Sequence, residues 1–177
     1  MILKVSRLGH PVLRRKAAAV NPKQMGAEGF QSFLEDLIET MHEYDGVGIA
    51  APQVHLSAQI AVIEAGRNVR YPKAPKIPLT VLVNPRLKPV RSKGKQDDWE
   101  GCLSVEGLRG RVPRWKCVDV SAYNRKGQKI RFRAEGFFAR VVQHEWDHLQ
   151  GRVFLDRMPN LLTLSHLIEY SRYGETN

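Results

Sequence analysis

The pentapeptide HEWDH at positions 144–148 constrains this chain most, because its two histidines meet only if the backbone around them is helical. Apolar residues recur at helical spacing from Gly136 to Gln150, and Gly151 is placed to end that helix. Two helical positions four residues apart differ by roughly 40° and one turn, so both imidazoles can bind one metal ion. Glu145 lies on the adjoining side, where its carboxylate can reach a water molecule bound to that metal. The pattern predicts a hydrolytic metal site on a helix.

The same helix allows a second interpretation of its histidines. One stripe along it carries Phe137, Val141, His144 and His148. The apolar members predict that this stripe faces the core, where imidazoles need polar partners. The alternative to metal binding is therefore a pair of core histidines that hydrogen-bond to backbone carbonyls.

A metal ion held by two histidines needs at least a third protein ligand. Downstream of the helix, the nearest candidates are Asp156, His166 and Glu169. Upstream, Cys102 lies between a glycine and a leucine, and a Cys-His-His set with water in the fourth position is an open, catalytic geometry. The only other cysteine, Cys117, lies in a strand pattern and is predicted to be a buried core residue. Two cysteines are too few for a disulfide scaffold, which favours a reducing compartment.

The remaining periodicities predict an α+β fold in one compact domain over residues 1–177, with mixed or antiparallel sheets around the central helix. An amphipathic helix is expected at 28–44, in the N-terminal half, and a C-terminal helix at 161–170 with Asn160 as its cap. Strands are expected at 59–64, 79–83, 117–123 and 128–133, the last two as a hairpin. The small residues of 46–51 predict a tight loop that lets another backbone approach closely. No apolar run is long enough for a membrane helix, so no membrane partner is expected.

Three segments together resemble the motifs of the peptide deformylase family. They are GVGIAAPQ at 46–53, EGCLS at 100–104 and QHEWDHL at 143–149. The resemblance extends from LGHPVLR at 8–14 through FLD at 154–156, in the same order and at similar separations.

The resemblance implies an enzyme that removes the N-formyl group from the initiator methionine of nascent polypeptides and releases formate. It implies that Cys102, His144 and His148 bind the metal. Water or hydroxide on that metal would attack the formyl carbon, with Glu145 as general acid and base. Gln53 and the backbone N–H of Leu103 would stabilise the oxyanion, and Gly48 would lie against the substrate. The walls of the methionine pocket are expected to be Val47, Phe137 and Val141.

One divalent ion is the expected cofactor. The ligand types suit Zn²⁺, Fe²⁺, Co²⁺ and Ni²⁺ alike. The resemblance implies Fe²⁺ as the physiological ion, with Ni²⁺ or Co²⁺ as active replacements and Zn²⁺ as a poorer one. A bacterial cytoplasm is the expected location, and an organelle matrix or stroma is the alternative.

Two acidic residues are expected to support the metal ligands from behind. Asp147 is predicted to pair with an arginine of the run 109–114, and Glu100 to orient the loop that carries Gln53.

The chain carries a formal charge of +10, because 28 Lys and Arg face 18 Asp and Glu. Nine of these cations fall in 65–96 without an acid, and nine in 109–133 with Asp119 as the only acid. Such blocks are typical of solvated loops and strand edges, and they also favour transient contact with ribosomal RNA. No specific DNA partner is expected. Two other functions fit the same motif: a different HExxH peptidase, and a metal-stabilised RNA-binding domain that would not need Glu145.

Overall fold

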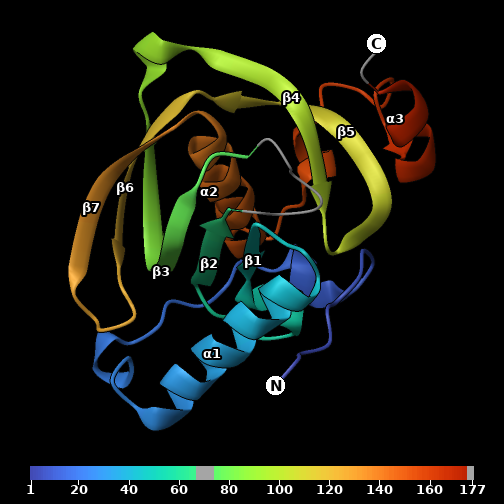
Figure 1. Cartoon of the computed structure of the whole chain (residues 1–177). Helices are drawn as coiled ribbons and strands as arrows, with labels where there is room; N and C mark the ends of the chain where they lie inside the picture. Colours follow the sequence, from blue (N-terminus) through green and yellow to red (C-terminus); the bar gives the residue numbers. More distant parts are fainter. Residues whose placement is uncertain (67–73, 175–177) are drawn as a thin grey trace.

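Helix α2 lies at the centre of the fold, with a five-stranded antiparallel sheet on one side and a three-stranded antiparallel sheet on the other (Figure 1). The computed structural model of the chain describes residues 1–66 and 74–174. The helices are α1 (Glu28–Glu43), α2 (Gly136–Leu149) and α3 (Leu167–Tyr173). The strands are β1 (Gly48–Ala50), β2 (Ile60–Ala65), β3 (Ile77–Pro89), β4 (Lys95–Cys102), β5 (Val105–Trp115), β6 (Cys117–Tyr123), β7 (Lys129–Glu135) and β8 (Ser165–His166). The predicted α+β class is confirmed, and the sheets are antiparallel.

Helix α1 covers one face of the five-stranded sheet, whose order is β1-β2-β3-β6-β7. Its periodic residues Leu34, Leu37 and Met41 are fully buried and share a cluster with Val62 and Val81 of the sheet. The predicted helix is confirmed to within one residue at its end. Burial of this stripe against the sheet contributes about 1.5–3 kcal/mol for each large side chain.

The predicted hairpin forms between β6 and β7, with Tyr123 opposite Lys129 and Cys117 opposite Glu135. Its turn closes because the Asn124 side chain accepts hydrogen bonds from two backbone N–H groups of the turn, while Gly127 adopts a φ of 73°. Cys117 is buried, as predicted. Strand β3 is longer than predicted, because its second half also pairs with β6.

The three-stranded sheet, in the order β4-β5-β8, was not predicted. Strand β4 is an edge strand whose first half, Lys95 to Asp98, is exposed and polar, so it lacks an apolar alternation. The basic run in β5 was expected to be solvated, yet Arg109 and Arg114 are both buried. Part of the other basic block, residues 67–73, lies outside the described residues.

The C-terminal helix is the element predicted least well. Residues 161–164 form a turn in which Asn160 accepts from the N–H of Leu162, and the helix begins only at Leu167. The apolar spacing of 161–170 was misleading, because Leu161 and Leu162 are exposed instead of packed. Residues 165–166 pair with β5 first, and His166 then caps α3. Among the described helices, none combines the length and apolar character needed to cross a bilayer.

Candidate metal centre and active site

Three metal-binding side chains converge where the end of β4 meets α2. One ligand atom each from Cys102, His144 and His148 lie within 4.8 Å of one another. The Sγ of Cys102 is 3.3 Å from Nε2 of His148, and the two imidazole rings are 5.0 Å apart between centroids. The predicted spacing on the helix and the predicted upstream thiol therefore meet at one point. Asp156, His166 and Glu169 are not part of this group.

The donor set fits a divalent transition-metal ion. A thiolate and two imidazoles leave a fourth position open, as in catalytic sites. Burial lowers the pKa of His148 well below its usual value, and the nearby His144 lowers it further, so this imidazole is neutral as ligation requires. Burial also lowers the pKa of His144, but hydrogen bonding to Cys102 and Glu100 outweighs burial and raises it. The alternative of core histidines bonded to backbone carbonyls is not supported, because Nδ1 of His144 meets the Glu100 carboxylate and Nδ1 of His148 has no hydrogen-bond partner among the described residues.

Glu145 lies beside these ligands with its carboxylate buried. Its Oε2 has no hydrogen-bond partner among the described residues, an arrangement that suits a carboxylate awaiting a water molecule. Burial raises the pKa of Glu145 to about 7, in the range where one group can both accept and donate a proton. The Cα of Gly48 on β1 faces this carboxylate closely, since a Cβ built there would lie 2.4 Å from Oε1.

The Gln53 side chain is held with its amide N–H directed at the metal centre. Its Oε1 accepts from the backbone N–H of Ala50 at 2.9 Å. Its Nε2 lies 3.2 Å from Oγ of Ser104 and 3.6 Å from Sγ of Cys102. The prediction that Glu100 orients this loop was wrong, because the loop's own backbone and Ser104 hold the amide.

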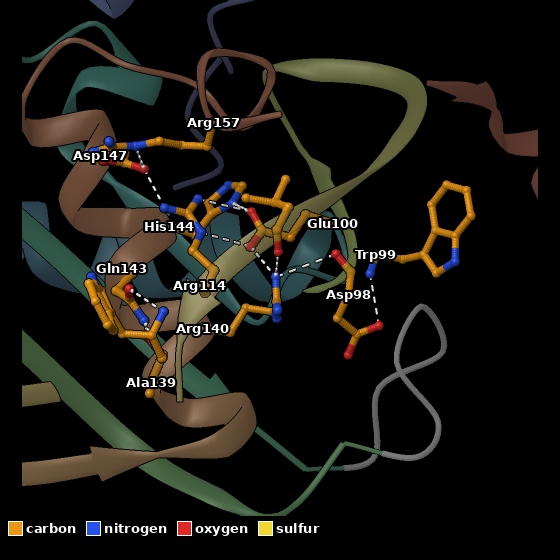
Figure 2. Close-up of polar contacts among 12 residues, drawn as sticks. Asp98, Trp99, Glu100, Arg114, Ala139, Arg140, Gln143, His144, Asp147 and Arg157 are labelled. Carbon is orange, nitrogen blue, oxygen red and sulfur yellow. Dashed lines mark hydrogen bonds and ion pairs between the residues drawn. The ribbon is translucent and has the colours of Figure 1, made fainter. Parts of the chain in front are cut away.

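Glu100 instead binds the back of the metal centre (Figure 2). Its Oε2 is 2.9 Å from Nδ1 of His144, and Arg114 donates to both carboxylate oxygens, at 2.9 and 3.0 Å. Arg140 donates to Oε1 at 2.7 Å. Burial alone raises the pKa of Glu100, but the Arg114 guanidinium and the bond to His144 outweigh it and hold that pKa well below its usual range. The carboxylate is thus ionised and fixes Nδ1 of His144 as a donor, which leaves Nε2 free to bind metal.

Asp147 pairs with Arg114, which confirms that part of the sequence prediction. Arg157, which the sequence did not point to, also donates to Asp147, at 2.5 Å from its Nη2. Asp147 is buried and does not line the pocket described below. Arg114 therefore links Glu100 on β4 to Asp147 on α2, and Arg140 and Arg157 supply further positive charge beside these two carboxylates.

We expect Asp147→Asn to lower the free energy of unfolding by about 3 kcal/mol, because it removes the carboxylate paired with Arg157 and one of the two carboxylates paired with the buried Arg114. Urea unfolding at fixed metal content measures this change. Asp119→Asn is the matched control, since its partner Arg133 and Asp119 itself are exposed. If the two variants lost the same free energy of unfolding, the buried carboxylate of Asp147 would be no more important for stability than the exposed one of Asp119, which would contradict the prediction.

A pocket opens beside the metal centre, between β1, the end of β4 and α2. Its lining includes nine of the residues predicted from the sequence: Val47, Gly48, Gln53, Cys102, Leu103, Phe137, Val141, His144 and Glu145. His148 lies behind them. Trp99 and Arg140 also line the pocket and were not predicted. Arg140 precedes His144 by one helical turn, a spacing that could have identified it.

A buried thiol and two histidines, with a buried acidic residue in the wall of the adjacent pocket, are typical of a metal-dependent hydrolase. The family model of polypeptide deformylase matches residues 2–163. The chain belongs to the peptide deformylase family.

Individual relatives agree with the family assignment. A peptide deformylase of Bordetella pertussis is 45% identical over 161 residues, which cover 91% of this chain and 90% of the relative. A peptide deformylase of Pseudomonas syringae is 41% identical over 174 residues, which cover 98% of this chain and 92% of the relative. The crystal structure of a class I type b peptide deformylase from Acinetobacter baumannii with Met-Ala-Ser bound matches with a TM-score of 0.86 and 37% identity, covering 89% of this chain and 99% of that one.

The protein is thus a metal-dependent hydrolase of protein biosynthesis that removes N-formyl groups from nascent peptides. The two other functions considered from the sequence, a different HExxH peptidase and a metal-stabilised RNA-binding domain, find no support in these comparisons.

Proposed function

We propose that Cys102, His144 and His148 hold one divalent ion and that the pocket beside them binds the formyl-methionyl end of a peptide. The observation that carries this proposal is the convergence of three ligand atoms within 4.8 Å, next to a buried carboxylate oxygen that has no partner among the described residues. When bound, such an ion polarises a carbonyl and lowers the pKa of a coordinated water toward neutrality. The ion is Fe²⁺ in the cell, and Ni²⁺, Co²⁺ or Zn²⁺ can replace it in a preparation.

Glu145 is the general acid and base of the reaction. Its carboxylate accepts a proton from the attacking water and later donates it to the departing amine. The bond between the formyl carbon and the amine nitrogen breaks, and formate and a free N-terminus are released. Burial raises the pKa of Glu145 to about 7, which suits both transfers.

The developing oxyanion is stabilised by the Gln53 amide and the backbone N–H of Leu103. The hydrogen bond from Ala50 to Gln53 fixes the amide before substrate arrives, so little reorganisation is required during the reaction. A single well-placed donor of this kind contributes about 3 kcal/mol.

The substrate backbone lies between two strand edges. Strand β1 is the terminal strand of one sheet and β4 of the other, and both border the pocket. The absence of a side chain at Gly48 leaves space for the peptide beside Glu145. The methionine side chain enters the part of the pocket lined by Val47, Phe137 and Val141. The Acinetobacter relative, whose bound peptide is Met-Ala-Ser, supports a peptide with an N-terminal methionine as the ligand.

The test is formate release from a panel of formyl-Met, acetyl-Met and free-amine peptides, with metal content measured on the same samples. We expect formate from the formylated peptide and no comparable hydrolysis of the others. Cleavage of the internal peptide bonds, or equal use of the acetylated peptide, would contradict the proposal.

The site of action is the bacterial cytoplasm, near the ribosome. Exposed cations such as Arg86, Lys129 and Arg131 lie in the basic blocks and would give a weak attraction to ribosomal RNA. Co-sedimentation with ribosomes should fall as salt rises, and salt-independent binding would contradict this contact.

A further inference from the structure

Arg140 is a buried guanidinium whose position makes it more than a member of the pocket wall. Its side chain is only 8% exposed. It donates to the Glu100 carboxylate at 2.7 Å and to three backbone carbonyls, those of Gln96 at 2.7 Å, Val112 at 2.8 Å and Asp98 at 3.4 Å. One side chain of α2 thus holds both β4 and the neighbouring strand β5 (Figure 2).

The helix and the strand meet here in a regular pattern. Arg140 and His144 are four residues apart on α2 and therefore lie on one face. Glu100 and Cys102 are two residues apart on β4, and both side chains meet histidines of α2, Glu100 at His144 and Cys102 at His148. The Glu100 carboxylate accepts hydrogen bonds from both helix residues, from Arg140 at Oε1 and from His144 at Oε2. The contact between Arg140 and Glu100 is therefore adjacent to the place where Cys102 meets the histidines.

The position of Cys102 depends on such side-chain contacts, because β4 is an edge strand. It pairs with β5 along one side, and the register shifts between Gly101 and Cys102. Regular pairing thus ends just before the thiol. The side-chain contacts that tie β4 to α2 near this point include those of Glu100 with Arg140 and His144 and the Arg114 bridge to Asp147.

We propose that Arg140 is a positioning residue for the metal centre: by holding Glu100 and the β4 carbonyls against α2, it aligns Cys102 with His144 and His148. This inference rests on the proposed metal ligands. The guanidinium suits the task because its planar fork reaches the carboxylate and several carbonyls at once. A lysine would keep the charge but bind at one point. Arg114 holds Glu100 from β5 and does not contact the carbonyls of Gln96 and Asp98 among the described contacts, so it does not replace Arg140.

Cobalt binding to the purified, metal-free protein tests the proposal. The probe is Co²⁺ alone, and the readouts are its dissociation constant and the thiolate-to-cobalt absorption band. We expect Arg140→Met to bind Co²⁺ about 10- to 100-fold more weakly and to show a weaker or shifted thiolate band. Arg140→Lys should lie between Arg140→Met and the wild type. Arg15→Met, a change at an exposed arginine that does not line the pocket, is the matched control and should match the wild type.

The outcomes separate this inference from the proposed function. A wild-type thiolate band that Cys102→Ser abolishes supports the ligand set, and absence of the band in the wild type would overturn that set itself. With the band present, wild-type affinity and spectrum in Arg140→Met would overturn only the role of Arg140. If circular dichroism shows that Arg140→Met does not fold, Arg140→Lys decides: weaker binding by a folded protein supports the inference, and wild-type binding overturns it.

Discussion

Glu145→Gln should lower kcat for deformylation by about 10²- to 10⁴-fold, the usual contribution of a positioned acid and base. The amide has nearly the shape of the carboxylate but cannot accept a proton. Because Oε2 of Glu145 has no partner among the described residues, the substitution breaks no hydrogen bond that holds the fold together. The loss should therefore appear in kcat at unchanged metal content and unchanged stability.

The measurement is formate release under saturating substrate, with the metal quantified in the same protein samples. Glu169→Gln is the matched control, because that carboxylate is half exposed on α3, away from the pocket. A glutamine variant that keeps even a tenth of the wild-type kcat would remove Glu145 from the acid and base role. Loss of metal along with activity would instead indicate that Glu145 supports the ligands.

Gly48→Ala should lower kcat/KM by about 100-fold, through a single methyl group. A Cβ at this position would lie 2.4 Å from Oε1 and 2.9 Å from Cδ of Glu145, closer than nonbonded atoms approach. The Glu145 side chain is 3% exposed and has little room to withdraw, so it must shift from its place beside the metal ligands. Displacement of a catalytic group by about 1 Å can cost 10²-fold in rate.

Steady-state kinetics with a formyl-Met peptide measures this change. Gly29→Ala is the matched control, because a Cβ at Gly29 of α1 would meet nothing within 4 Å and alanine favours a helix. Wild-type kcat/KM in Gly48→Ala would mean that the close approach of β1 to Glu145 has no importance for catalysis.

The elements that local periodicity specifies were predictable from the sequence. Helix α1, the β6–β7 hairpin and helix α2 each follow from a pattern within 20 residues, and each was found where it was expected. The histidine spacing in α2 also predicted that the His144 and His148 rings lie side by side, as they do. These features depend on interactions between residues close in the sequence, which a single chain reveals directly.

The features that the sequence did not predict depend on contacts between segments that are distant in the sequence. Strand β4 is polar because its edge faces solvent, so it gives no strand signal, although it carries Cys102. Arg114 was predicted only as one of the arginines that could pair with Asp147, and Arg140 was not predicted, because only the meeting of β4, β5 and α2 buries both against Glu100. Leu161 and Leu162 have the spacing of a helix but remain exposed, because residues 165–166 extend the β5 sheet instead. In each case tertiary contacts override the local pattern.

The free edges of β1 and β4, between which we propose that the peptide binds, also expose the protein to association with itself. An unpaired strand edge offers hydrogen bonds to any extended chain, including a second copy of the same enzyme. Strand β1 limits this hazard by its length of three residues, and β4 by the charges of Lys95, Asp97 and Asp98 along its exposed half. The polar residues of β4 give no strand pattern in the sequence. The same residues disfavour pairing of this edge with a second copy of the chain, which leaves the edge open for the proposed substrate.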